Sequence, residues 1–192
     1  MPIVRKEQKV DNWSVLIRGA QGKAGNIFGN TGNFIDQTNV PDVKIEKMAI
    51  APGLVRGLFG GKRDFLVISE TGNSNLAPYQ MFIGARDYGD NLDVSWYLTY
   101  RIGYGEKAWA SLLKVPILNI LLLPFALMRG FGRLAKVKKV GFELDLFDEQ
   151  DLRAYATNVH HCLLQAVDKL MLELNQDPSK IDRKSRGFLG IS

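Results

Sequence analysis

Apolar and polar residues alternate in several short runs of the first hundred residues. Side chains of a β-strand point alternately to its two faces, so such runs predict half-buried strands. We expect strands at residues 13–18, 43–50, 64–69, 78–87 and 92–102. Residues 88–91 (YGDN) lie between the last two runs and are typical of a hairpin turn. A further alternating run at 137–147 predicts a final strand.

A different period begins near residue 148. Apolar residues recur at spacings of three and four from Leu152 to Leu174, which predicts a long amphipathic helix. Asp148 or Asp151 suits its N-terminal end, and the helix should end before Pro178. A second apolar stripe runs beside the first, through His160, Leu164, Val167 and Met171.

Glycine interrupts residues 19–33 at five positions: Gly19, Gly22, Gly25, Gly29 and Gly32. Glycine loses the most backbone entropy on ordering. We therefore expect a loop or short elements here rather than a regular helix.

Together these patterns predict an α+β fold, in which an antiparallel sheet of about five or six strands is packed by the long C-terminal helix. Residues 106–136 form a helical segment that Pro116 and Pro124 should kink. We expect a single α+β domain over residues 1–177, containing that segment as an insertion. A basic and then apolar tail follows at 178–192.

Residues 110–128 (ASLLKVPILNILLLPFALM) are the most apolar stretch of the chain, and five cations follow within residues 129–139. Apolar sequence beside clustered cations is typical of membrane-surface binding, through burial and attraction to anionic headgroups. The two prolines enclose only residues 117–123, too few to cross a bilayer, which favours shallow insertion over a full span. The residues expected to contact lipid are Ile117, Leu118, Leu121, Leu122, Phe125, Leu127, Arg129, Arg133, Lys136, Lys138 and Lys139. The apolar loop residues 54–59 (LVRGLF) are a candidate second contact.

The charge of the chain favours an anionic partner, but its distribution also allows self-assembly. The net charge of +5 favours lipid, nucleic acid or an acidic protein. Residues 105–140 carry seven Lys or Arg and one acid, a net of +6, whereas residues 141–177 carry eight acids and two bases, a net of −6. These segments can pair within the fold or between subunits. The alternative is a self-assembling homo-oligomer, in which the apolar helix and the tail residues Phe188, Leu189 and Ile191 form subunit contacts.

Catalytic chemistry finds little support. His160, His161 and Cys162 are consecutive on the predicted helix and must point in different directions. No Walker, HExxH or GxSxG pattern occurs, so we expect a non-enzymatic protein without a metal or cofactor. Residues 19–22 (GAQG) match the bare GxxG of a backbone clamp, which makes nucleic-acid binding only a third hypothesis.

The single cysteine and the N-terminal residues bear on location. One cysteine excludes an internal disulfide and fits a reducing compartment. Residues 1–10 carry charges where a signal peptide needs apolar residues. We expect a cytoplasmic, membrane-associated protein.

Overall fold

The computed structural model describes residues 9–50, 63–100, 144–187 and 189–191. The chain divides into two units, residues 1–100 with 146–192, and residues 101–145. Only Leu144 and Asp145 of the second unit are described, so the account below concerns the first.

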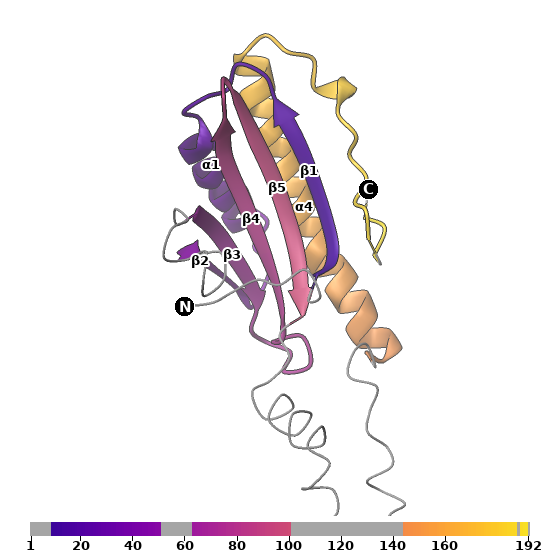
Figure 1. Cartoon of the computed structure of the whole chain (residues 1–192). Helices are drawn as coiled ribbons and strands as arrows, with labels where there is room; N and C mark the ends of the chain where they lie inside the picture. The colour runs from indigo at the N-terminus through magenta and orange to yellow at the C-terminus, as the bar shows by residue number, and fades with distance from the viewer. Residues whose placement is uncertain (1–8, 51–62, 101–143, 188, 192) are drawn as a thin grey trace, which may run out of the picture. The chain divides into compact units, whose positions relative to one another are not determined.

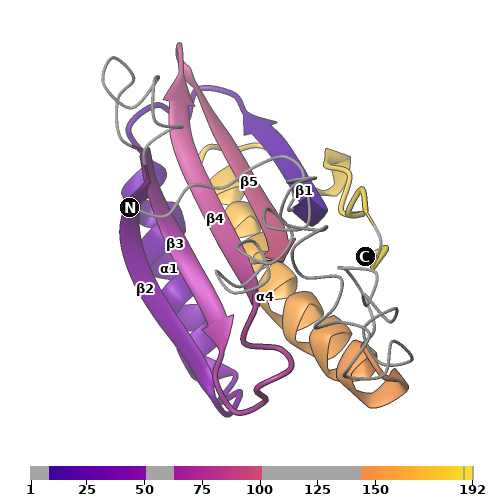
Figure 2. The same ribbon diagram turned by 60° about the horizontal axis from the view of Figure 1, so that its bottom comes forward.

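Five strands form one antiparallel sheet (Figures 1 and 2). Their bounds are Lys9–Ile17 (β1), Val43–Ile50 (β2), Arg63–Glu70 (β3), Tyr79–Tyr88 (β4) and Asn91–Tyr100 (β5). The order in the sheet is β1-β5-β4-β3-β2, so the first strand lies beside the last. Tyr88 pairs with Asn91 at the predicted hairpin turn. The expected strands in the first hundred residues are therefore confirmed.

Two helices pack against one face of this sheet, and Figures 1 and 2 show both behind the strands. The long helix α4 spans Leu146–Glu173 and the shorter α1 spans Ala24–Gln37. The register aligns Trp13, Trp96 and Ile83 across β1, β5 and β4. These side chains and both predicted stripes of α4 are buried, except that Leu174 follows the end of the helix and is only partly buried. The predicted α+β class, an antiparallel sheet packed by a long C-terminal helix, is confirmed.

The expectation of a loop at residues 19–33 is wrong, because α1 forms there. Its buried residues are Ile27, Phe28, Thr31 and Ile35, which share one face at helical spacing. That face packs near α4, where Lys169 and Asn158 hydrogen-bond to residues of the α1 region. Burial of an amphipathic face thus outweighs the low helix propensity of glycine.

The start of α4 also differs from prediction. The strand predicted at 137–147 is wrong at Leu146 and Phe147, which are the first two residues of the helix. Residues 137–143 lie outside the described residues. Asp148, in the first turn, accepts hydrogen bonds from the side-chain amides of Asn73 and Asn75, each at 2.9 Å. These bonds tie the start of α4 to the loop between β3 and β4.

The face of the sheet opposite the helices changes character from one edge to the other. On β2, β3 and β4 it carries an apolar cluster of Ile50, Val67 and Phe82, with Met48 and Phe65 packed against it. Further across, the register gives a row of Phe65, Gly84, Ser95 and Ser14, one residue from each of four strands. We call the face opposite the helices the second face of the sheet.

Candidate functional site

The residues that the sequence predicted to bind lipid cannot be placed. Ile117, Leu118, Leu121, Leu122, Phe125, Leu127, Arg129, Arg133, Lys136, Lys138 and Lys139 all lie outside the described residues. So do Phe188 and the apolar loop at 54–59. Within the described part of the chain, no helix has both the length and the apolar character needed to cross a bilayer.

Two of the predicted assembly contacts are described, and both lie inside the chain's own fold. Leu189 and Ile191 are buried. The backbone N–H of Leu189 donates to Oδ2 of Asp11 on β1 at 3.1 Å, and its carbonyl accepts from Arg153 of α4 at 2.9 Å. Contacts with a second subunit stay a prediction, but these two side chains already have an intramolecular site.

The rest of the tail follows β1 and α4. Ser185 donates its hydroxyl to Asp11 at 2.9 Å, and the N–H of Arg186 donates to the carbonyl of Asn12 at 2.7 Å. Arg183 forms an ion pair with Asp168 at 2.8 Å. Figure 1 shows the tail running beside β1 toward the C-terminus. Because β1 is an edge strand, the tail covers backbone groups that another chain would otherwise pair with.

Both ring nitrogens of the buried His160 have hydrogen-bond partners. Its Nδ1 accepts from Nε1 of Trp96 at 2.8 Å, and its Nε2 lies 2.8 Å from the carbonyl of Arg183. A carbonyl can only accept, so the ring is the neutral tautomer with its proton on Nε2. Burial lowers the pKa of His160. His161 is exposed and Cys162 is buried at a separate position, so the three consecutive residues do not form one site.

A pocket of about 520 Å³ opens where β3 and β4 separate. Pairing between these strands begins at Phe65 and Gly84, although β3 starts at Arg63. The small residues Gly84 and Ser95 occupy neighbouring positions on the second face and leave it hollow. A Cβ added to Gly84 would lie 2.9 Å from Cε1 of Phe65, so that ring passes close over the glycine.

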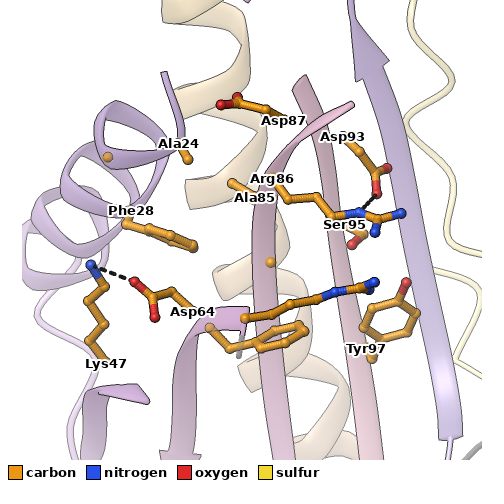
Figure 3. A pocket seen from close by; sticks show the side chains of 14 residues that line it. Ala24, Phe28, Lys47, Asp64, Ala85, Arg86, Asp87, Asp93, Ser95 and Tyr97 are labelled. Carbon is orange, nitrogen blue, oxygen red and sulfur yellow. Dashed lines mark hydrogen bonds and ion pairs between the residues drawn. The ribbon is translucent and has the colours of Figure 1, made fainter. Parts of the chain in front are cut away.

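Most charges around the pocket are paired (Figure 3). Lys47 on β2 lies 3.3 Å from Asp64 on β3, and Nε of Arg86 on β4 lies 3.2 Å from Asp93 on β5. Arg63 also lines the pocket and is exposed, and among the described residues no carboxylate pairs with it. In Figure 3, Ser95 and Tyr97 extend from β5 on the same side as the Arg86–Asp93 pair.

The N-terminal turn of α1 borders the other side of this pocket. Gly19 and Gly22 of the GxxG sequence both have positive φ, at 63° and 77°. The N–H of Gly22 donates to Oδ1 of Asp87 at 2.9 Å, so a carboxylate of the chain itself already occupies this donor. The helix that a GxxG clamp requires does follow, contrary to the prediction, but the bond to Asp87 occupies one of its backbone donors.

The sequence contained part of the signal for this pocket. The hairpin turn at 88–91 fixes the Arg86–Asp93 pairing, and alternation places Ser95 and Tyr97 with Asp93. The position of Arg63 and Phe65 depends on the β3–β4 register, which the irregular connection at 71–78 does not determine. Within the described residues, no cluster of His, Cys, Asp or Glu is arranged to hold a metal ion.

Comparison with known proteins adds no family assignment. The chain matches no protein-family model, and no curated protein or solved structure is significantly similar to it.

Proposed function

We propose that this protein binds anionic membrane surfaces without catalysing a reaction. In this proposal, residues 117–128 bury apolar side chains at the lipid surface, and the five cations within residues 129–139 contact phosphate groups. Each cation contributes on the order of 1 kcal/mol near an anionic surface. Together, an apolar and an electrostatic contribution give stable attachment where either alone is marginal.

The observation that carries the proposal is the exposure of Leu146 and Phe147. These consecutive residues begin α4 directly after the segment that carries the apolar and basic residues, and their side chains are 77% and 74% exposed. Large apolar side chains grouped on a surface mark sites of contact with lipid or protein. In this proposal, the lipid-binding region includes these two residues of the described fold.

Residues 51–62 and the segment after β5 are attached to the sheet at different places. The loop 51–62 leaves from Ile50 and returns at Arg63, which pair with each other at one end of the sheet. The segment after β5 leaves from Tyr100, which pairs with Tyr79 at the opposite end. A ten-residue strand such as β4 is about 33 Å long, so these attachment points are far apart. The proposal assigns the membrane contact to residues 117–139, with Leu146 and Phe147.

Co-sedimentation with vesicles tests this proposal. The full chain should pellet with vesicles that contain phosphatidylserine and remain largely in solution with pure phosphatidylcholine. Changing the five cations to glutamine should weaken binding by roughly 100-fold or more and remove its dependence on salt. The five positions are Arg129, Arg133, Lys136, Lys138 and Lys139.

A matched control removes the same charge elsewhere. Glutamine is placed at five exposed cations of the described fold, namely Arg18, Lys23, Lys44, Lys180 and Lys184. This control should retain most of its binding to anionic vesicles. A third variant, Leu146→Ser with Phe147→Ser, should weaken binding by about tenfold because apolar burial is lost. Equal binding by the wild-type chain and the first variant would overturn the proposal.

A further inference from the structure

The second face of the sheet carries a hollow whose chemistry the membrane proposal does not use. It lies toward the end of the sheet at which Ile50 pairs with Arg63, away from Tyr100. Its charged lining consists of three cations and three acids, a net charge of zero: Lys47, Arg63, Arg86, Asp64, Asp87 and Asp93. Asp64 pairs with Lys47 and Asp93 pairs with Arg86, while Asp87 accepts the N–H of Gly22. Among the described residues, Arg63 is thus the lining cation that no carboxylate pairs with.

Arg63 is suited to hold an oxyanion. A guanidinium presents parallel N–H donors that match two oxygens of a phosphate or carboxylate. Two hydroxyls, those of Ser95 and Tyr97, line the same hollow. Within the described residues, neither hydroxyl is bonded to another protein group. Three donor groups thus face one space, which fits the several oxygens of a phosphate better than the two of a carboxylate.

Aromatic rings form part of the wall. Phe65 lies close over Gly84, and the Tyr97 ring occupies the next position along β5 after Ser95. Both side chains are only partly buried, so a ligand that covers them gains hydrophobic burial. The pocket volume of about 520 Å³ is within the range of small-molecule sites.

We propose that this pocket binds a small organic phosphate. Arg63 would hold the phosphate with help from the Ser95 and Tyr97 hydroxyls, and the apolar body of the ligand would lie against Phe65 and Tyr97. Such a ligand can be a soluble phosphate ester or the headgroup of a phospholipid, because the two share this chemistry. The inference does not depend on the membrane proposal, since it uses other residues.

The test is a nuclear magnetic resonance titration of the full-length, ¹⁵N-labelled chain with two soluble probes. One probe is 1-naphthyl phosphate, and the other is monomeric dihexanoyl phosphatidic acid. Saturable shifts of the backbone amides of Phe65, Gly84 and Ser95 support the proposal. Shifts with the first probe alone identify a soluble ester as the ligand class, and shifts with the second alone identify a lipid headgroup.

Variants separate a specific site from general attraction to a basic protein. Arg63→Gln should weaken binding of the active probe about tenfold or more, because a charge-assisted bidentate contact is lost. Arg63→Lys should bind with intermediate affinity, since it keeps the charge but not the planar fork. Lys44→Gln removes the same charge from an exposed position of β2 outside the pocket and should leave affinity unchanged.

Arg63 is exposed, so these variants should remain folded, which a thermal unfolding curve verifies. The proposal is overturned if neither probe shifts these amides up to its solubility limit. Equal affinity of the wild-type chain and Arg63→Gln would overturn it as well. Neither result would affect the vesicle experiment, whose variants leave Arg63 in place.

Discussion

Trp96 on β5 donates its indole N–H to Nδ1 of His160 on α4 across 2.8 Å. The opposite nitrogen of the same ring lies 2.8 Å from the carbonyl of Arg183 in the C-terminal tail. Trp13 and Trp96 both present their rings to His160 in edge geometry at 5.6 Å. One buried imidazole thus joins the sheet, the long helix and the tail.

We expect His160→Ala to lower the free energy of unfolding by about 3 kcal/mol, since it removes a buried ring and leaves the Trp96 N–H without an acceptor. His161→Ala is the neighbouring control at an exposed position, and its effect should be below about 1 kcal/mol. Urea denaturation followed by tryptophan fluorescence measures both. Similar losses in the two variants would show that His160 does not have the joining role described here.

Acidic pH should destabilise the fold through the same residue. Burial lowers the pKa of His160 in the folded state, whereas the unfolded chain takes up this proton near pH 6.5. The unfolded state therefore binds more protons below that pH, so the stabilising contribution is complete above about 6.5 and declines as pH falls. The charged groups near His160 are Asp11, Arg183 and His161.

Comparison with His160→Gln isolates this contribution. Both proteins are unfolded with urea at a series of pH values from about 7.5 to 5. The wild-type chain should lose more stability than the variant over this range, because glutamine does not titrate. Parallel pH dependences would show that His160 does not titrate differently on folding.

Alanine in α1 should stabilise the protein. Gly29 and Gly32 are helical, and a Cβ added at either position meets no atom within 4 Å. Gly29→Ala and Gly32→Ala should each raise the free energy of unfolding by about 0.5–1 kcal/mol by reducing the entropy of the unfolded chain. Gly19→Ala should instead destabilise the protein, because Gly19 has a φ of +63°. Destabilisation by alanine at both helical positions would contradict a helix there.

Deleting residues 187–192 separates the two roles considered for the tail. If the tail docks within its own chain, the deletion should lower the free energy of unfolding by roughly 3 kcal/mol. It removes the buried side chains of Leu189 and Ile191 and the N–H that donates to Asp11. The mass in light scattering should be unchanged. The assembly hypothesis predicts that an oligomer dissociates, so a fall in mass would favour subunit contacts by these residues.

A single glycine offers a milder perturbation of the same contact. A Cβ at Gly187 would lie 2.5 Å from the Cα of Asp11, a backbone atom that cannot easily move. Gly187→Ala should therefore weaken tail docking and make the C-terminal residues more sensitive to protease. Wild-type protease sensitivity would show that the tail does not pass over Asp11 in this way.

Sequence reasoning succeeded where one local pattern decides the structure. Alternation located the strands, and the three-and-four spacing located α4 with its two stripes, including His160. It failed at α1, because glycine content measures only local propensity, whereas Ile27, Phe28 and Ile35 are stabilised by packing. The strand predicted at 137–147 also included Leu146 and Phe147, which belong to α4, because two adjacent apolar residues fit a strand as well as a helix.

The candidate pocket was harder to predict for a related reason. The pairing of Arg86 with Asp93 follows from a two-residue hairpin turn, which the sequence displays. Arg63 joins them only through the register between β3 and β4, and long-range pairing is not encoded in any short segment. The docking of the tail on β1 was missed for the same reason, since Asp11 and Leu189 are 178 positions apart.

The membrane proposal is tested most directly by expressing the full chain in cells and separating membranes from supernatant without detergent. The account predicts that the protein pellets with membranes and is released by high salt or alkaline carbonate, as expected for a surface contact that depends on the cations at 129–139. Resistance to both washes would contradict shallow insertion and indicate an integral segment. Protein found entirely in the supernatant would contradict membrane association itself.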